Sequence, residues 1–303
     1  MGEVFYWIFN MSIIASICGV FILLIRCFKK IPRRFLVILW LIPFIRMCLP
    51  VGITGKYGIM SLISKFTTKS VIVYEIGDAT FLTMMNSTMA AEGYFPLVYK
   101  FKLIDDVFSI ASIIWLVVLS LLILLFSLVY FSEIKKIKDS THYKDNIYFS
   151  NKVNYPSVYG IIKPKIIIPY EYKESNIDYI IMHERTHIKR LDNFFRVASF
   201  LITCVHWFNP LSWLFLKLLY NDMELACDET VISKCNETEI KEYANTLLSS
   251  LEKSSIIKSN LGGAKIRTRI KNILSYKNLT VLSVIGFSSI IVIIAYILLT
   301  NAI

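Results

Sequence analysis

The chain has 303 residues, of which 55% are hydrophobic and only 18% are charged, and its mean hydropathy is +0.58. A soluble domain carries roughly 25% charged residues, and a disordered chain or a small disulfide scaffold is excluded by the same composition. The formal charge of +11 could indicate a nucleic-acid surface, but basic residues in a membrane chain collect at its cytoplasmic flanks. We therefore expect a mostly α-helical integral membrane protein whose partner is the lipid bilayer, with no direct contact to nucleic acid.

Four stretches are long and apolar enough to predict transmembrane helices, each longer than the roughly 20 residues that a span requires. They cover about residues 4–25, 35–55, 107–132 and 278–303. The second stretch contains Arg46, which we expect to snorkel or to pair inside the helix bundle. A place in a signalling or ion pathway is the alternative for this arginine.

The basic residues predict the orientation of these helices. The connection between the first two carries Arg26, Lys29, Lys30, Arg33 and Arg34 and no acidic residue. Such a connection is typical of the cytoplasmic side, which places both termini of this multi-pass cell-membrane protein outside. The N-terminal membrane region then covers 1–132 with an outer loop at 56–106, and 133–277 forms one cytoplasmic domain.

A metal-binding pattern occurs once in the cytoplasmic domain, in the sequence His183-Glu184-Arg185-Thr186-His187. The surrounding residues predict a helix over 176–190, on which a spacing of four places both imidazoles on one face. Zinc can take two nitrogen ligands from such a helix, and Glu184 could accept a proton from zinc-bound water as the catalytic base. Ordinary structural histidines are the alternative, but the chain has only 4 histidines, and two of them fall at this spacing around a glutamate.

A second predicted helix, over 221–234, supplies the remaining protein ligand that zinc needs. Glu224 and Asp228 lie four residues apart on it, so we expect Glu224 to bind the metal and Asp228 to orient a histidine. A solvated acidic helix face is the alternative. Cys227 could also bind zinc, but it lies off the face of Glu224 and Asp228. Asp192 either orients the site or forms a salt bridge at a helix end.

An apolar block at 194–220 separates the two parts of this predicted site. A single crossing would put His187 and Glu224 on opposite sides of the bilayer, so the block must cross an even number of times or not at all. Asn209-Pro210 breaks the helix near its middle and predicts a hairpin at or within the cytoplasmic leaflet. His206 lies beside the break, where a structural role is favoured over contact with a tetrahedral intermediate.

Residues 157–169 predict two short strands around a turn, so the cytoplasmic domain is expected to be α+β. An exposed strand edge before the metal-binding helix could hold an extended peptide by strand addition. Alternatively, the hairpin simply covers the core of the domain.

Taken together, four motifs resemble the BlaR/MecR family of membrane metallopeptidases, the β-lactam sensor-transducers. They are PSVYGIIKPKIIIP at 156–169, HERTH followed by IKRLD at 183–192, HWFNP at 206–210 and ELACD at 224–228. The resemblance implies a gluzincin-like zinc metalloendopeptidase, with zinc on His183, His187 and Glu224, and Glu184 as general base. Asp192 matches a family position. The resemblance also implies that the enzyme cleaves a cytoplasmic transcriptional repressor, and in some settings itself, after an outside signal.

The sequence departs from the best-known members of this family, which carry a penicillin-binding sensor domain after the last span. This chain stops at Ile303 and offers no serine acylation motif, so we do not carry β-lactam sensing over to it. A stimulus would instead act through the 56–106 loop, the bilayer or a separate partner. Residues 254–277 are expected to form an accessible linker where self-cleavage could occur.

Two other functions stay open at this point. One is a housekeeping membrane protease similar to the HtpX and CAAX-prenyl endopeptidases, which share the histidine pair and an acidic second helix. The other is a zinc-stabilised membrane receptor without enzymatic activity, against which the intact Glu184 argues, because a structural site needs no base. A homodimer is left open, and the frequent Lys, Ile and Asn favour a low-GC bacterial source.

Overall fold

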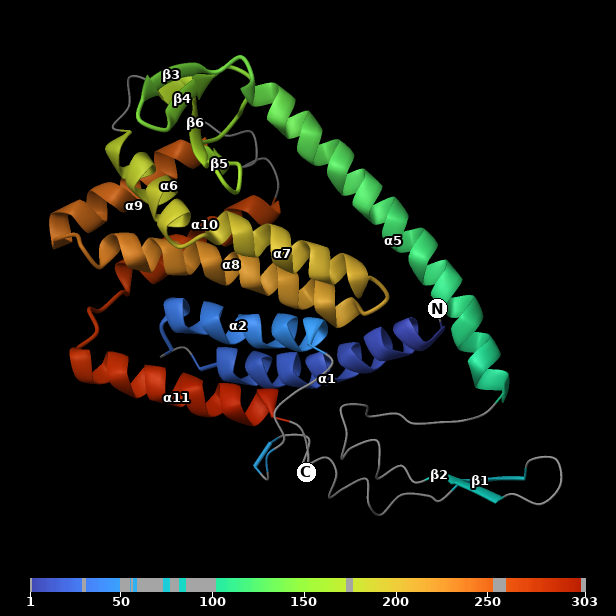
Figure 1. Cartoon of the computed structure of the whole chain (residues 1–303). Helices are drawn as coiled ribbons and strands as arrows, with labels where there is room; N and C mark the ends of the chain where they lie inside the picture. Colours follow the sequence, from blue (N-terminus) through green and yellow to red (C-terminus); the bar gives the residue numbers. More distant parts are fainter. Residues whose placement is uncertain are drawn as a thin grey trace.

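The computed structural model describes residues 2–28, 31–49, 55, 57–58, 73–76, 82–85, 102–172, 177–252 and 260–300 (Figure 1). It is mostly helical, as expected, with one four-stranded sheet at one end of the molecule. The predicted outer loop at 56–106 lies largely outside the described residues. Its described part includes β1 (Val73–Ile76) and β2 (Leu82–Met85), which pair antiparallel.

Within the described part of the chain, three helices contain stretches that are long and apolar enough to cross a membrane. These stretches are Val4–Arg26 in α1 (Gly2–Arg26), Val107–Ile137 in α5 (Lys102–Ile137) and Val281–Leu299 in α11 (Val281–Leu299). They match the first, third and fourth predicted spans by length and composition. The second predicted span, 35–55, corresponds to α2 (Arg33–Cys48), which has 16 residues. Residues 50–54 lie outside the described chain. A membrane crossing by α2 therefore stays a prediction.

Helix α2 is enclosed by α1, α8 and α11 rather than open to lipid on most sides. Its Trp40 is fully buried, and Arg46 is 2% exposed. The Arg46 guanidinium donates to the carbonyl oxygens of Leu298 (2.9 Å) and Thr300 (3.0 Å) at the end of α11. Arg46 thus pairs inside the bundle, as the first of the two readings expected, and supplies donors to the carbonyls that end α11.

Helix α5 runs along one side of the molecule, as Figure 1 shows, and most of its apolar stretch is exposed. It touches the hairpin through Trp115, whose indole nitrogen donates to the carbonyl oxygen of Val205 (2.7 Å), and through Phe126, which packs on Phe200. An apolar helix surface of this kind is stable in lipid and not in water.

The apolar block folds as two antiparallel helices, α7 (Asp192–Val205) and α8 (Pro210–Ile232). The helices meet at the expected break, where Asn209 caps α8 by accepting from the amide of Leu211 (3.0 Å) and Pro210 occupies the first turn. The Asn209 amide also donates to the hydroxyls of Ser12 and Ser16 of α1, both at 2.8 Å. The tip of the hairpin therefore lies against the middle of a membrane-spanning candidate.

Close packing of α8 on α1 depends on a glycine. A Cβ added to Gly19 would lie 2.1 Å from the ring of Phe215, which is fully buried. The aromatic ring therefore occupies the space that a side chain at position 19 would fill. Phe215 also packs on Trp40 of α2, so the apolar part of α8 belongs to the same core as α1 and α2.

The sheet has the strand order β3-β4-β6-β5. Its strands are β3 (Thr141–Lys144), β4 (Ile147–Ser150), β5 (Ser157–Tyr159) and β6 (Lys165–Pro169). The two strands that the sequence predicts are β5 and β6, which pair antiparallel around a turn where Gly160 has φ +89°. β4 pairs parallel with β6, and β5 forms an edge. One face buries Ile166 and Ile168 against Ile180 of α6 (Asp178–Lys189).

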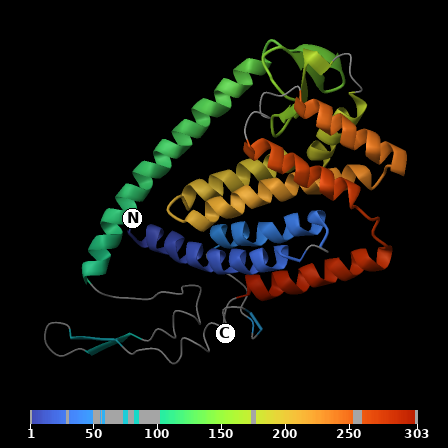
Figure 2. The ribbon, with the colours of Figure 1, turned by 180° about the vertical axis from the view of Figure 1, so that it is seen from behind.

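Two further helices follow α8: α9 (Glu237–Glu252) and α10 (Asn260–Leu274). Both contact α8, and Figure 2 shows α10 crossing α8 below the sheet. The prediction of an accessible linker over 254–277 is therefore wrong for residues 260–274. These residues are helical because Ile273 packs among Val231, Ile232 and Tyr243, and because Arg269 reaches a buried carboxylate.

Candidate metal centre

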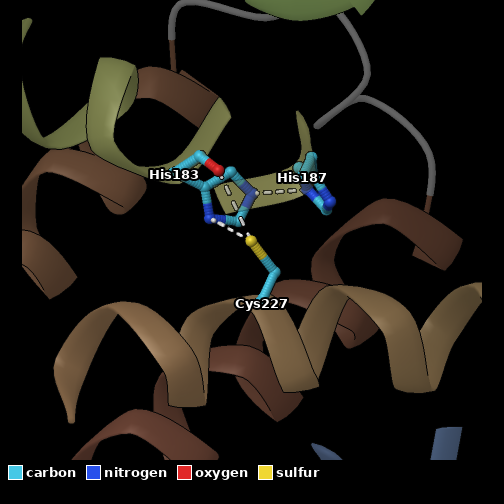
Figure 3. Close-up of side chains that lie close together, drawn as sticks. All are labelled: His183, His187 and Cys227. Atoms are coloured by element: carbon cyan, nitrogen blue, oxygen red, sulfur yellow. Dashed lines mark hydrogen bonds between the residues drawn. The ribbon is translucent and has the colours of Figure 1, made fainter. Parts of the chain in front are cut away.

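His183 and His187 project from α6 toward α8, and both are nearly fully buried. Their Nε2 atoms lie 3.1 Å apart, with the ring planes at 90° to one another (Figure 3). This arrangement follows from the spacing of four residues on a helix. Two nitrogen lone pairs can approach so closely only when a proton or a metal ion lies between them.

The other nitrogen of each ring has a fixed partner. His187 Nδ1 lies 2.7 Å from Asp192 Oδ2. His183 Nδ1 lies 2.8 Å from the hydroxyl of Tyr243 on α9, which donates in turn to Asp228 Oδ1 (2.7 Å). With Nδ1–H donating in both rings, the two Nε2 atoms are left as acceptors for a metal.

Asp192 reaches His187 because the chain turns sharply between α6 and α7. Leu191 adopts φ 58° at this junction, and Asp192 then begins α7. Asp192 also lies 3.4 Å from Arg190 Nε, so it performs both functions that the sequence left open. The role expected for Asp228 is mostly indirect, because its Oδ1 lies 3.4 Å from His183 Nδ1 and Tyr243 bridges the two.

Glu224 completes the group from the facing helix α8. Its Oε2 lies 3.7 Å from His183 Nε2, and its Oε1 lies 3.7 Å from His187 Nε2. A tetrahedral zinc ion with bonds of about 2.0–2.1 Å holds its ligand atoms about 3.3 Å from one another. The three side chains that the sequence singled out therefore converge at nearly the spacing that zinc requires.

Cys227 lies close to the same histidines, and its ligand atom falls within 4.8 Å of theirs. Its Sγ, however, faces the other side of His183, 3.6 Å from Nδ1 and 3.5 Å from the carbonyl oxygen (Figure 3). Cys227 thus faces the Nδ1 side of His183, whereas the Glu224 oxygens face the two Nε2 atoms.

Two arginines flank Glu224. Arg196 of α7 forms an ion pair with Glu224 Oε1, and Arg269 Nη1 of α10 lies 3.6 Å from Glu224 Oε2. Arg269 also binds Asp228 with two nitrogens, at 2.8 Å and 2.7 Å, which is the bidentate geometry that arginine prefers. Sequence spacing indicated neither arginine, nor Tyr243, because none of them lies on the histidine helix or on the face of α8 that carries Glu224 and Asp228.

These charges set the protonation of the group. Burial by itself raises the pKa of Glu224, but the neighbouring His183 and the charges of Arg269, His187 and Arg196 hold that pKa well below the usual range. Burial lowers the pKa of His187, but the hydrogen bond that its Nδ1–H donates to Asp192 and the charges of Glu224 and Glu184 outweigh it and raise the pKa. Glu224 is thus ionised, as a metal ligand must be.

A pocket of about 270 Å³ opens beside these residues. Its walls come from the segment before β5 and from β5 itself, from α6, α7, α8, α9 and α10, and they include Glu184 together with His183, His187 and Glu224. His206 is not among the residues that line it. That histidine is buried at the hairpin turn, 3.1 Å from the carbonyl oxygen of Met47, which fits the structural role favoured from the sequence.

The fold and the site fit the class of membrane metallopeptidases. The fold supplies apolar helices suited to a bilayer, and the site places a buried histidine pair and a facing carboxylate beside a pocket. The family model of the BlaR1 peptidase M56 matches residues 6–274. The chain therefore belongs to this family of metallopeptidases, as the four sequence motifs indicated.

The curated relatives carry the names of resistance and regulatory proteins. The chain is 30% identical to the methicillin resistance mecR1 protein of Staphylococcus aureus over 148 residues, which are 44% of this chain and 25% of the relative. It is 28% identical to the regulatory protein BlaR1 of Bacillus licheniformis over 152 residues (45% and 24%), and 26% identical to BlaR1 of Staphylococcus aureus over 190 residues (55% and 32%). The chain thus spans about a quarter to a third of the length of these relatives.

Proposed function

We propose that the protein is a zinc metalloendopeptidase of the membrane that hydrolyses peptide bonds on the cytoplasmic side. The observation that carries this proposal is the convergence of three side chains, with two Nε2 atoms 3.1 Å apart and one carboxylate oxygen of Glu224 3.7 Å from each. Fixed partners on both Nδ1 atoms add to it, because they orient the rings for a metal. A gluzincin-like arrangement, in which the third ligand is a glutamate from a later helix, is part of the proposal.

A bound zinc ion supplies a water of lowered pKa and a Lewis acid for the substrate carbonyl. Glu184 lines the same pocket as the ligands and is 8% exposed. Its carboxylate accepts the proton of the attacking water and passes it to the leaving amine. Asp192 and Tyr243 keep the imidazoles oriented during this reaction, and Arg196 keeps Glu224 ionised.

An extended substrate enters along the segment that precedes β5, because Tyr155, Pro156 and Ser157 line the pocket and β5 is an edge strand. Pairing along the whole of β5 is hindered. The side chain of Asn193 already donates to the carbonyl oxygens of Val158 (2.9 Å) and Gly160 (3.1 Å). The substrate backbone therefore pairs with the N-terminal part of the edge.

The names of the relatives support a role in signal transduction, in which the substrate is a cytoplasmic transcriptional repressor. We include in the proposal that α2 is the fourth crossing and that both termini lie outside. The basic residues between α1 and α2 support this orientation. Self-cleavage and a homodimer are compatible with it.

The substitution Glu184→Gln tests the proposal. We expect the purified variant to retain its zinc and to lose peptide cleavage by about 10²–10⁴-fold, because only the base is removed. Zinc is measured by mass spectrometry of the metal, and cleavage by product peptides from a peptide library and from co-expressed cytoplasmic proteins. The control is Asp178→Asn, an exposed carboxylate on the same helix, which should retain both. Undiminished zinc-dependent cleavage by Glu184→Gln would refute the assignment of the base.

A further inference from the structure

The turn between β5 and β6 carries large apolar side chains into solvent. Ile162 is 92% exposed and Ile161 is 36% exposed, next to Gly160 and Lys163 at the tip. A two-strand turn in water is usually polar, with residues such as Gly, Asn, Asp or Ser. The conformation needs the glycine with its positive φ, but nothing in the turn geometry requires two isoleucines.

The turn is held in a fixed place at the start of α7. The Asn193 side chain donates to the carbonyl oxygens of Val158 and Gly160, at 2.9 Å and 3.1 Å. Two further apolar residues are exposed at this junction, since Leu191 is 59% exposed and Phe194 is 51% exposed. We call Ile161, Ile162, Leu191 and Phe194 the apolar tip. Asn193 joins the turn to the start of α7, so the four residues of the apolar tip lie on neighbouring segments of the chain.

The apolar tip lies next to α7, which contacts the membrane-spanning candidate α5. α7 begins beside it and then packs on α5 through Phe126 and Phe200. The open face of α5 extends to Phe131, which is 61% exposed. The helix ends at Ile137 and β3 begins at Thr141, so the exposed apolar surface of α5 ends next to the sheet that contains β5.

Basic residues accompany this surface. Lys163 is exposed in the turn beside Ile162, and Lys135 and Lys136 are exposed in the last turn of α5. Apolar side chains bordered by lysines are the combination that binds the interface of an anionic leaflet, with the apolar part among the acyl chains and the ammonium groups among the phosphates.

We propose that the apolar tip inserts into the cytoplasmic face of the bilayer and anchors the edge strand β5 there. The strand that lines the metal pocket is then tied to the membrane at two places, through α7 and through the turn. The pocket consequently opens close to the lipid surface, so the peptides it admits are those that can reach that surface. This inference goes beyond the proposed peptidase activity and requires neither a metal nor cleavage.

The test measures the immersion of residue 162 in full-length protein reconstituted in nanodiscs of phosphatidylcholine and phosphatidylglycerol. A nitroxide is attached to Ile162→Cys after the exposed Cys27 and Cys48 are changed to Ser. Tyr143→Cys is the matched control, because Tyr143 is an exposed apolar side chain (54%) on β3, at the opposite edge of the sheet. Collisions with oxygen, which concentrates in lipid, are compared with collisions with a neutral nickel chelate, which stays in water.

We expect the label at residue 162 to collide several-fold more often with oxygen than with nickel, and the label at 143 to show the reverse. Nickel access at 162 equal to that at 143 would overturn the proposal, because the tip would then be in water. Protection of residue 162 from both reagents would also overturn it, since a protein surface, such as a second copy of the chain, would then cover the tip. Because no metal or substrate is involved, these outcomes are independent of those for Glu184→Gln.

Discussion

The two halves of helix α8 are both buried, but different forces hold them. The half from Pro210 to Tyr220 packs apolar side chains such as Phe215 and Leu219 against α1 and α2. The half from Asn221 to Ile232 buries acidic groups, with Asp222 and Asp228 fully enclosed. One continuous helix therefore joins a membrane-type core to a cluster of ions.

The acidic half can be buried only because each of its carboxylates forms an ion pair or a hydrogen bond. Asp222 accepts from Arg26 (2.8 Å and 3.2 Å), Arg33 (3.3 Å) and the indole of Trp40 (2.8 Å). A buried ion pair contributes little net stability, but the loss of one partner is costly. The basic residues that the sequence assigned to membrane orientation thus also bind the helix that carries Glu224. From this comparison we expect a substitution of an acidic residue in the second half to break ion pairs. A substitution in the first half should disturb only side-chain packing and helix capping.

The largest effect is expected for Asp222→Ala. It leaves the partly exposed Arg26 and Arg33 without their shared carboxylate and the buried indole of Trp40 without its acceptor, so we expect the unfolding free energy to fall by about 2–4 kcal/mol. Thermal unfolding in detergent measures the change. Asp139→Ala is the control, because Asp139 pairs with Lys152 on the surface and its loss should cost little stability. Equal losses in the two variants would contradict the assignment of Asp222 as the anchor of α8.

Glu224→Gln should weaken zinc binding by at least about 100-fold while the helix stays folded, because a neutral amide replaces the anionic ligand. Competition with a chelating dye measures the affinity. Glu229→Gln provides the comparison on the same helix, since Glu229 accepts from the amide of Arg34 (3.2 Å) and lies away from the histidines. Zinc affinity that drops equally in both variants would show that general disturbance of α8, and not loss of a ligand, is the cause.

A smaller effect is expected at the apolar end, for Asn209→Ala. The variant loses the cap of α8 and the hydrogen bonds to Ser12 and Ser16, so stability should fall by about 1–2 kcal/mol. Zinc affinity should be unchanged, because the metal ligands lie in the other half. Asn209→Ser keeps an oxygen for the cap but is too short for α1, and its loss should be intermediate. A fall in zinc affinity with Asn209→Ala would break the separation of the two halves.

The smallest effect is expected for Cys227→Ser. The thiol faces the Nδ1 side of His183, so the substitution should change zinc affinity less than about twofold and stability by about 1 kcal/mol or less. The same dye competition measures it. A loss similar to that of Glu224→Gln would identify Cys227 as a ligand.

The sequence predicted those parts of the site that depend on spacing along one helix. His183 and His187 share a face of α6 by periodicity alone, as do Glu224 and Asp228 on α8. Asn209-Pro210 likewise predicted the helix break from backbone chemistry.

Side chains brought in by tertiary folding left no such signal. Tyr243 reaches His183 across 60 positions of the chain and Arg269 reaches Asp228 across 41, and no local pattern marks either residue. Helix α10 was expected to be a linker because its polar, glycine-containing start obscures the contacts that order it. Strand β3 was missed because all four of its residues are exposed, so it lacks the alternation of a half-buried strand.

X-ray absorption at the zinc edge of the purified, full-length protein tests the central claim most directly, since it reports the atoms bound to the metal. With His183, His187 and Glu224 as ligands, we predict a shell of nitrogen and oxygen at about 2.0–2.1 Å with the scattering pattern of two imidazoles. A sulfur neighbour at about 2.3 Å, or protein that holds no zinc, would contradict the account.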